Sequence, residues 1–302
     1  MPKSSKSSAD AAPSPIRIIL LGANGLLGSS MMRCLSSHSR FSVRRLDRNQ
    51  LNLSDPLLVD EILSDLEFDW LINCAAYTAV DDCENQSGHA YLLNGHAPGQ
   101  VARLCAAKGA RMIQFSTDYV FDGTQREAYT EEDPTNPISI YGRSKLMGER
   151  QVLAAHRDHI VIRLSWLFGP GRPNFPEWVL RQAAAGSIRV VTDKTGCPTY
   201  TEDVARWVSS LLLRPRSGGG VIHVCNPPAC TWFEYASEIL RLAKLPVQPE
   251  PIVMSDLRGL QAARPDNSAL DVTHFESLTG QQCRPWREAI AEYIAKKETG
   301  SF

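Results

Sequence analysis

A tyrosine and a lysine four residues apart carry the clearest chemistry in this sequence. Tyr141 and Lys145 stand in the segment YGRSK, and residues four apart share one face of a helix. A free phenol has a pKa of about 10, whereas a neighbouring ammonium favours the phenolate and eases proton exchange near neutral pH. The pair therefore predicts acid–base catalysis by Tyr141. Alone, this spacing is also common on solvated helix faces, so its neighbours decide.

A hydroxyl and a carboxyl group are expected beside this pair. The segment FSTDYVF places Ser116, Thr117 and Asp118 where a buried apolar run ends. This position is the carboxyl edge of a parallel sheet, where open α/β sheets bind their ligands. Thr117 precedes Tyr141 by 24 residues, and its hydroxyl can hydrogen-bond both the phenol and a substrate carbonyl. Taken singly, Thr117 would be a strand-end cap and Asp118 a turn former.

A glycine-rich turn predicts a dinucleotide site at the same edge. Gly22, Gly25 and Gly28 lie between an apolar run and a helical pattern, where glycine permits a tight turn and lets a pyrophosphate approach the helix N-terminus. Asp47 follows Gly28 by 19 residues, where an acid that binds the ribose is expected. Asp47 favours NAD, whereas Arg48 can pair with the 2′-phosphate of NADP. A turn without ligand and a solvated Arg48 are the plain alternatives.

These residues need a parallel sheet to bring them together. Apolar segments at 16–22, 41–46, 69–75, 111–116 and 160–165 alternate with helical patterns at 26–37, 55–66, about 86–108 and from 141. Strands separated by such helices require parallel crossovers, so residues 16–165 are predicted to form a doubly wound α/β (Rossmann) sheet. The small residues at 75–78 follow the third strand, beside the expected nicotinamide ribose, although they could also be packing residues.

The rest of the chain has a less regular pattern. Residues 166–302 predict mainly a smaller α/β substrate-binding domain, with helices at about 201–213 and 231–244 and a last helix in WREAIAEYIAKK. Parts near 200–225 are expected to return to the sheet. Residues 1–15 hold five Ser and three Pro and no large apolar side chain after Met1. They predict a disordered tail rather than a targeting peptide.

Composition excludes several classes of protein. The chain has 302 residues with 32 basic and 33 acidic side chains, so nucleic acid and anionic membrane surfaces are poor candidates as partners. No apolar run reaches the roughly 20 residues that a membrane span needs. The eight cysteines form no Cys-x-x-Cys pair, which predicts reduced thiols and a cytoplasmic location.

In these segments the chain resembles the dTDP-4-dehydrorhamnose reductases of the extended short-chain dehydrogenase/reductase superfamily. The resemblance runs from Ile16 to the last helix through GANGLLG, NCAAYTAVD, FSTDYVFDG, YGRSKLMGE, RLSWLFG, DKTGCPT, CTWFEYA and ARPDNSALD. It implies reduction of the 4-keto group of dTDP-4-dehydro-L-rhamnose, or of a close 4-keto-6-deoxy nucleotide sugar, in polysaccharide biosynthesis. The implied cofactor is NADPH or NADH, with NADPH slightly favoured.

The resemblance also implies roles for single residues. Tyr141 would donate a proton to the C4 oxygen, Lys145 would lower the pKa of Tyr141 and hold the nicotinamide ribose, and Thr117 would polarise the carbonyl. Substrate contacts are implied for Thr117, Asp118, Trp166 and Arg264. For Arg264, pairing with the nucleotide diphosphate and stapling of its own loop through backbone carbonyls both stay open. Cofactor contacts are implied for Gly22, Asn24, Gly25, Leu26, Leu27, Gly28, Asp47, Arg48, Asn52, Leu53, Ala75, Ala76, Tyr77, Thr78, Phe115, Tyr141 and Lys145.

Departures from the family pattern bear on metal and reaction type. Asn52 stands where relatives have an adenine-side aspartate, and Ser30 stands where some relatives hold magnesium with a glutamate, so no such metal is expected. Asp118 is followed by Tyr119, whereas dehydratases resembling this fold carry an Asp-Glu pair there, which favours simple reduction.

Two other functions remain open. One is a nucleotide-sugar epimerase, and the other is a non-catalytic NADP-binding subunit resembling the β subunit of methionine adenosyltransferase. The expected partner is a dTDP-sugar, with no nucleic acid and no membrane. A homodimer through the helices that begin near Gln86 and Tyr141 is compatible with the pattern, because relatives of this superfamily often pair there.

Overall fold

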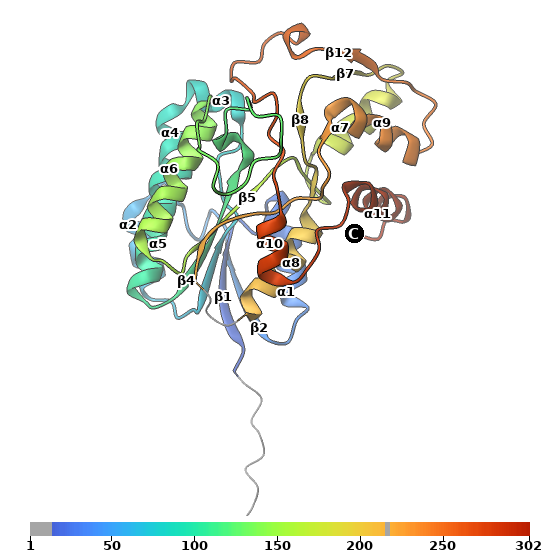
Figure 1. Cartoon of the computed structure of the whole chain (residues 1–302). Coiled ribbons are helices and arrows are strands. Elements are labelled where there is room, and N and C mark those ends of the chain that lie inside the picture. The colour runs from blue at the N-terminus through green and yellow to red at the C-terminus, as the bar shows by residue number, and fades with distance from the viewer. Residues whose placement is uncertain (1–13, 215–217) are drawn as a thin grey trace, which may run out of the picture.

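A six-stranded parallel sheet forms the centre of the larger lobe (Figure 1). The computed structural model describes residues 14–214 and 218–302. The strand order is β10-β5-β4-β3-β1-β2, and all neighbouring strands run parallel. The strands are β1 (Ile16–Leu21), β2 (Phe41–Leu46), β3 (Trp70–Asn73), β4 (Arg111–Thr117), β5 (Ile160–Leu164) and β10 (Gly220–His223). The predicted doubly wound α/β sheet is confirmed.

Helices cover both faces of this sheet, which explains the near-continuous apolar strands. Alternate residues of β1 enter two separate cores, with Ile18 on one face and Ile19 on the other. The first core is closed by α1 (Leu26–Ser36) and α8 (Thr201–Leu213), which pack against each other. The second core is closed by α2 (Pro56–Ser64), α5 (Ala97–Ala107) and α6 (Ile140–Ala155). Buried on both sides, the strand ends hold their side chains in fixed positions at the sheet edge.

Side-chain caps determine where two of these helices begin. The Asp55 side chain accepts hydrogen bonds from the backbone N–H groups of Leu57 and Leu58 at the start of α2, as its Asp-Pro signature predicts. Ser139 accepts from the backbone N–H of Gly142 and starts α6. The segment YGRSK, which holds the predicted Tyr141–Lys145 pair, therefore begins within the first turn of a capped helix.

A continuous helical stretch passes through a π turn beside α6. After α3 (Val80–Asn85), the chain runs through α4 (Ser87–Tyr91), a π helix (Leu92–His96) and α5 without a break. The predicted helix at about 86–108 is thus present, but its π turn was not predicted. Glycines bring it close to α6, since a Cβ at Gly148 would lie 2.1 Å from the Asn94 carbonyl oxygen.

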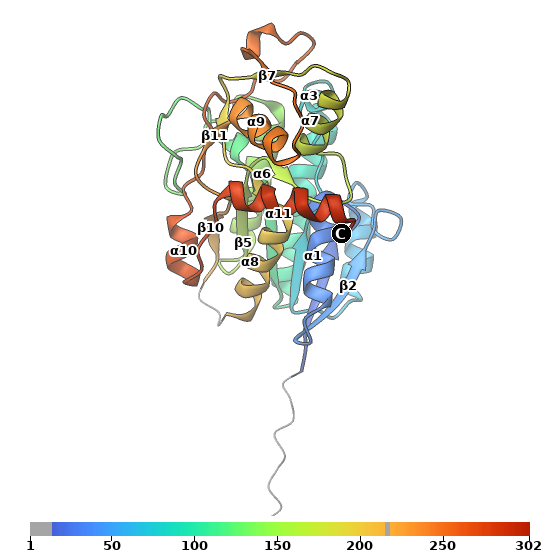
Figure 2. The same cartoon turned by 90° about the vertical axis from the view of Figure 1, so that its right-hand side faces the viewer.

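The smaller lobe lies beyond the carboxyl ends of the strands (Figures 1 and 2). It contains α7 (Phe175–Ala184), α9 (Trp232–Leu242), α11 (Trp286–Thr299) and three short strand pairs. Its core is aromatic, with Phe168, Tyr235, Trp286 and Tyr293 fully buried. The strand pairs are β6 (Leu167–Phe168) with β9 (Thr199–Tyr200), β7 (Arg189–Val191) with β12 (Glu250–Ile252), and β8 (Thr195–Gly196) with β11 (Cys230–Thr231).

The chain returns to the larger lobe twice. Helix α8 packs on α1, and β10 then adds the sixth strand beside β5. Later, residues 261–271, which we call the strap, run from the smaller lobe to the larger one, and α10 (Thr273–Thr279) contacts β10. The strap is held by hydrogen bonds from the Tyr129 N–H to the Ala269 oxygen and from the Ser268 N–H to the Thr195 oxygen, at 2.8 and 2.9 Å.

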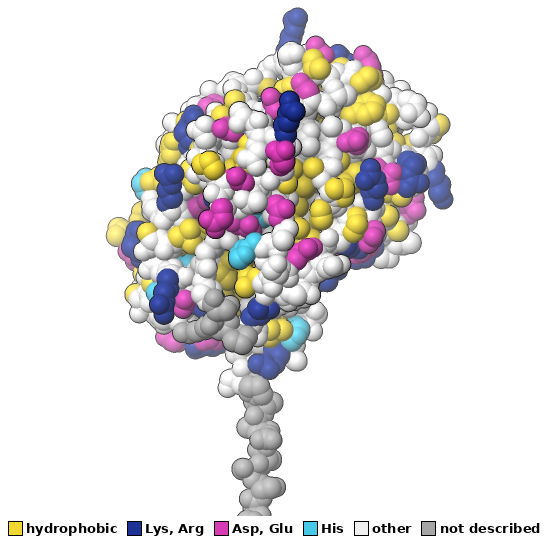
Figure 3. Space-filling view, in the orientation of Figure 1, with side chains coloured by type: hydrophobic (Ala, Val, Ile, Leu, Met, Phe, Trp, Pro, Cys, Tyr) yellow, Lys and Arg dark blue, Asp and Glu magenta, His cyan; other side chains and the backbone are white. Residues whose placement is uncertain are grey.

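Acidic and basic side chains are interspersed on the face of the molecule that Figure 3 shows. Within residues 14–214 and 218–302, no helix is both long and apolar enough to cross a membrane. Most of the predicted tail, residues 1–13, lies outside the described residues.

Candidate functional site

The predicted catalytic residues meet in one cavity at the carboxyl edge of the sheet. The cavity has a volume of about 480 Å³. Thr117 at the end of β4 and Tyr141 and Lys145 on α6 all line it. Other predicted residues that line it are Gly25, Leu26, Leu27, Ala76, Thr78, Phe115, Asp118 and Trp166. The topology therefore brings together residues that are spread over more than a hundred positions of sequence.

Lys145 is buried and bound to the backbone of β4. Its Nζ donates to the Phe115 carbonyl oxygen at 2.6 Å. Burial lowers the pKa of Lys145 to about 8, while the negative charge of Glu149 opposes that fall. The group is therefore an ammonium at neutral pH, close to the point at which it loses its proton.

The surroundings of Tyr141 favour its neutral phenol over the phenolate. Burial raises the pKa of Tyr141 above its ordinary value, and the Thr117 side chain opposes the rise. Desolvation of the phenol dominates, and the Lys145 ammonium is bound to the Phe115 carbonyl oxygen, so the lowering of the pKa of Tyr141 by Lys145 stays a prediction. The ring of Tyr119 packs edge-on against Tyr141, with ring centroids 5.7 Å apart.

Asp118 follows Thr117 in a short 3-10 helix, Asp118–Val120, at the wall of the same cavity. Its Oδ1 accepts from the Thr117 hydroxyl at 2.9 Å. Burial raises the pKa of Asp118 to about 6, against the opposing hydrogen bonds from Ser268 and Thr117. A buried carboxyl group beside two hydroxyl-bearing residues can bind a ligand rich in hydroxyl groups.

The glycine turn leaves room for a phosphate group at the start of α1. Gly22 has a φ of +71°, and a Cβ at Gly28 would lie 2.1 Å from the Gly22 carbonyl oxygen. Gly25 is the N-cap of α1 and offers no side-chain cap. The first N–H groups of the helix are therefore available to an anion. These observations fit the predicted dinucleotide pyrophosphate.

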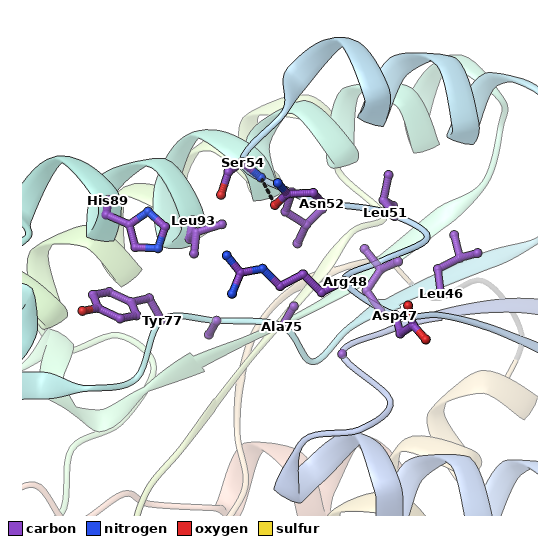
Figure 4. Close-up of a pocket in the computed structure, with 14 residues that line it drawn as sticks. Leu46, Asp47, Arg48, Leu51, Asn52, Ser54, Ala75, Tyr77, His89 and Leu93 are labelled. Carbon is purple, nitrogen blue, oxygen red and sulfur yellow. Dashed lines mark hydrogen bonds between the residues drawn. The ribbon is translucent and has the colours of Figure 1, made fainter.

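A second cavity of about 260 Å³ adjoins the glycine turn and matches the predicted adenosine site (Figure 4). Its walls include the predicted residues Gly22, Asp47, Arg48, Asn52, Leu53, Ala75, Ala76 and Tyr77. Figure 4 shows the Arg48 side chain reaching across the pocket, whereas the Asp47 carboxylate points away from it. Asp47 Oδ1 accepts from the backbone N–H groups of Asn49 and Gln50, at 2.9 and 3.1 Å.

His89 and Leu93 also line this second cavity but were not predicted. His89 packs edge-on against the Tyr77 ring, with centroids 5.0 Å apart. Their four-residue spacing on a helix was the only available signal, and it is shared by many ordinary core positions.

Asn94 in the π turn holds the loop after β3 by its backbone. Its Oδ1 accepts from the Tyr77 N–H at 2.8 Å, and its Nδ2 donates to the Tyr77 carbonyl oxygen at 2.9 Å. The same Nδ2 donates to Ser144 Oγ on α6 at 3.1 Å. One amide thus joins the cofactor side of the site to the helix that carries Tyr141 and Lys145.

A buried ion pair anchors α6 to β5. Glu149, one turn after Lys145, accepts from Arg163 Nε at 3.0 Å and from Nη2 at 2.7 Å, and the two side chains are only 2% and 5% exposed. Arg163 Nη1 lies 3.3 Å from His223 Nε2. Burial lowers the pKa of His223 to about 3, so the neutral ring accepts from the guanidinium.

Sequence reasoning missed this pair. The signals were an arginine inside the apolar strand IVIRL and a glutamate four residues after Lys145. The Arg163 guanidinium also lies over the Phe121 ring at 5.1 Å, so it contacts the segment that follows Asp118. The pair therefore joins α6 and β5 to the segment that follows Asp118.

The two remaining predicted substrate residues differ in position. Trp166 has a φ of +42° and its ring packs over Gly196, where a Cβ would approach it to 2.5 Å. Arg264 is bound to Asp81 at the start of α3, with Nη2–Oδ2 and Nη1–Oδ1 distances of 2.6 and 3.2 Å. Its Nη1 also donates to the Ala262 carbonyl oxygen of its own loop at 2.9 Å, as the second reading from sequence expects. This pair and two backbone N–H groups of the strap lower the pKa of Asp81 to about 2. The predicted pairing of Arg264 with a diphosphate stays a prediction.

Comparison with known proteins covers nearly the whole chain. The family described as RmlD substrate binding domain matches residues 16–299. The chain belongs to this family. A member from Streptomyces griseus, a dTDP-4-dehydrorhamnose reductase, is 35% identical over 282 residues, which are 91% of this chain and 92% of that protein.

Solved structures of dTDP-4-dehydrorhamnose reductases have the same fold. The dTDP-4-dehydrorhamnose reductase of Clostridium acetobutylicum superposes with a TM-score of 0.89 at 34% identity, covering 94% of this chain and 100% of that one. The enzyme of Bacillus anthracis, solved in complex with NADP, has a TM-score of 0.87 at 32% identity, covering 93% and 99%. Because these matches cover nearly the whole of both chains, the two solved structures share the smaller lobe as well as the sheet.

The hydroxyl of Ser30, the residue from which the absence of a metal is predicted, faces another hydroxyl. Ser30 Oγ lies 2.8 Å from Thr201 Oγ1. Nearby, Lys296 Nζ contacts Glu202 and Glu292 at 2.7 and 2.8 Å. Among the described residues, no group of three or more His, Cys, Asp or Glu side chains is arranged to hold a metal ion. The absence of a metal stays a prediction.

Proposed function

We propose that this chain reduces the 4-keto group of dTDP-4-dehydro-L-rhamnose, or of a close 4-keto-6-deoxy nucleotide sugar, with NADPH or NADH. The observation that carries the proposal is the convergence of Thr117, Tyr141 and Lys145 on one cavity next to the glycine turn. The named activity of relatives that match over nine-tenths of the chain supports it. The reaction belongs to nucleotide-sugar biosynthesis.

The chain's own residues divide the work of the reaction. The reduced nicotinamide supplies the hydride for C4 when the cofactor is bound. We propose that the glycine turn and the start of α1 hold its diphosphate, that the second cavity holds its adenosine, and that Ala76, Thr78 and Phe115 border the nicotinamide. Trp166 and Asp118 are proposed to contact the sugar, because both line the catalytic cavity.

Proton transfer falls to Tyr141. A phenol whose pKa is raised by burial holds its proton at neutral pH and can release it when negative charge develops on the C4 oxygen. Thr117 lies beside the phenol, and its hydroxyl can donate to the same oxygen by turning away from Asp118 Oδ1. The Lys145 ammonium contributes a positive charge within the same buried space, where charges act more strongly than in water.

Reduction is expected to slow as the pH rises above about 8. The folded-state pKa of Lys145 is lowered to about 8, so the ammonium is present below that pH and is lost above it. Initial rates at saturating cofactor between pH 6 and 10 would show this limb. Lys145→Arg keeps its positive charge over this pH range. Its rate of reduction should be lower than that of wild type but should not fall further above pH 8. A wild-type rate that stays constant to pH 10 would contradict the role of the ammonium.

Preference for NADPH is expected to depend on Arg48. Its side chain reaches across the adenosine cavity while Asp47 is bound to backbone N–H groups, so a 2′-phosphate meets a guanidinium rather than a free carboxylate. A charge-assisted hydrogen bond contributes about 1.5–3 kcal/mol. Arg48→Gln should therefore raise the KM for NADPH about 10- to 100-fold and change that for NADH less than about threefold.

Arg45 offers the matched control for this measurement. It is exposed on β2, three residues before Arg48, and does not line the cavity. Arg45→Gln is expected to leave both KM values unchanged. Equal losses for NADH and NADPH in Arg48→Gln would show that Arg48 supports the adenosine rather than the 2′-phosphate.

The function itself is tested by following NAD(P)H oxidation with a panel of 4-keto-6-deoxy nucleotide sugars. Stoichiometric oxidation with formation of the 4-hydroxy sugar supports the proposal. Tightly retained NAD without net oxidation would support an epimerase. Binding of NADP without turnover of any sugar, together with capture of a methionine adenosyltransferase, would support the regulatory subunit instead.

We also propose a cytoplasmic location and a sugar-binding role for residues 166–302. All eight cysteines are free thiols, which suits a reducing compartment. Trp166 and Leu167 line the proposed catalytic cavity at the point where the chain enters the smaller lobe. A dTDP-sugar is the partner that this arrangement favours, and the homodimer stays a prediction.

A further inference from the structure

A loop of the smaller lobe reaches the glycine turn through one arginine. Residues 169–174 connect β6 to α7, and Arg172 in this loop donates from Nε to the Asn24 carbonyl oxygen at 3.0 Å. The two residues are 148 positions apart in sequence. Arg172 is exposed, and in the described part of the chain its two terminal nitrogens make no hydrogen bond.

The loop around Arg172 is fixed by its own hydrogen bonds. Asn174 Nδ2 donates to the carbonyl oxygens of Gly169 and Arg172, at 2.7 and 3.0 Å. The same residue caps α7, because its Oδ1 accepts from the Glu177 N–H at 3.2 Å. Gly171 has a φ of +89°, which supplies the bend in front of Arg172. Hydrogen bonds within the loop thus hold the backbone at Arg172, and the bond from Nε to the Asn24 oxygen holds its side chain.

Charge at the glycine turn is otherwise scarce. The dinucleotide of the proposed function would carry two negative charges on its diphosphate, and the glycine turn that would hold this group borders both cavities through Gly22 and Gly25. Among the residues that line these cavities, Arg48 and Lys145 are the only Lys or Arg side chains, and they serve the opposite ends of the cofactor. The N-terminus of α1 supplies the equivalent of about half a charge. A guanidinium has five N–H donors, so Arg172 can keep its bond to Asn24 and still bind phosphate oxygens.

We propose that Arg172 binds the diphosphate of the nicotinamide cofactor from the smaller lobe. This inference rests on the cofactor of the proposed function but not on the identity of the sugar. The larger lobe binds the diphosphate by backbone N–H groups at the start of α1, and Arg172 adds a charged clamp on the other side. Cofactor affinity then depends on contact between the two lobes at the Asn24–Arg172 position.

The test is a direct titration of NADPH and NADH without any sugar. Arg172→Met removes the charge and keeps an aliphatic stem, and it is expected to raise the Kd of both cofactors about tenfold. Arg181→Met removes the same charge from an exposed position on α7 of the same lobe and should leave both Kd values unchanged. The equal effect on both cofactors separates Arg172 from Arg48, whose loss affects NADPH alone.

Salt dependence distinguishes a phosphate contact from a change in loop shape. The Kd of wild type should rise with salt between 50 and 300 mM, and that of Arg172→Met should rise less steeply. Kd values within about twofold of wild type in folded Arg172→Met would overturn the proposal, as would a weaker affinity with an unchanged salt slope. If Arg172→Met binds the cofactor more weakly but the wild-type chain reduces no sugar of the panel, the proposed substrate is wrong and the role of Arg172 still stands.

Discussion

Replacement of Tyr141 by phenylalanine is expected to reduce the rate of ketone reduction by about 10³-fold or more while leaving the Kd for NADPH within about twofold. Helix α6 contributes two side chains to the cavity, Tyr141 and Lys145, and of these the Tyr141 phenol is the proton donor that lies next to Thr117. General acid catalysis by such a group contributes about 10²- to 10⁴-fold. Single-turnover reduction of the keto-sugar, together with a separate titration of the cofactor, measures both quantities.

Tyr119 provides the matched control for that loss. Its ring lines the same cavity and packs edge-on against Tyr141 at 5.7 Å, so Tyr119→Phe removes a neighbouring hydroxyl from the same environment. We expect less than a tenfold change in rate. If Tyr119→Phe is inactive and Tyr141→Phe is not, the proton donor has been misidentified.

Glu149→Gln is expected to lower the free energy of unfolding by about 3–5 kcal/mol. The substitution leaves the Arg163 guanidinium, which is 5% exposed, without its carboxylate. An unpaired buried charge costs far more than the ion pair contributes, because water cannot replace the lost partner. Denaturant unfolding of the full chain, monitored by circular dichroism, measures the change.

A surface pair gives the contrast for this experiment. Glu238 and Arg241 form an ion pair on α9 in which the arginine is 66% exposed, so Glu238→Gln should cost less than about 1 kcal/mol. The double variant Glu149→Gln with Arg163→Met removes both buried charges and should recover part of the loss. A single-variant loss of less than 1 kcal/mol would show that Arg163 finds another partner or reaches solvent.

The local parts of the site could be predicted from sequence because each depends on a few residues at short, fixed spacing. The glycine turn requires small residues at fixed spacing, and the Tyr141–Lys145 pair requires one helical turn. The apolar strands between them determine that both segments end at the same sheet edge. The structure accordingly places Thr117, Tyr141 and Lys145 around one cavity.

The directions in which side chains point, and the partners that they bind, could be predicted from sequence less well. Asp47 lies at the predicted place beside the adenosine cavity, but its carboxylate is bound to the N–H groups of its own turn. Arg264 lies on the strap, and its partner Asp81 stands 183 residues earlier. Partners of this kind depend on how two distant segments pack, which no local pattern records.

The same limit applies to the supports of the site. Glu149, Arg163 and Asn94 are polar residues within segments that otherwise predict only a helix or a strand. Helix α7 is not among the helices predicted for residues 166–302. Its N-cap Asn174 and the following Pro176 form a helix-start signal, but the amphipathic stretch behind them is only ten residues long.

The π turn at Leu92–His96 makes the rotational phase of one long helix depend on a single residue. Successive residues of an α-helix are about 100° apart around its axis, and a π turn accommodates one residue more than an α turn. His89 faces the adenosine cavity before the turn, whereas Val101 and Cys105 pack into the sheet core after it. Deleting one residue here would turn the second half by about a quarter of a revolution relative to the first. Loss of a single residue in this stretch would therefore be far more harmful than a substitution, because the side that faces the cavity and the side that faces the sheet would no longer be aligned.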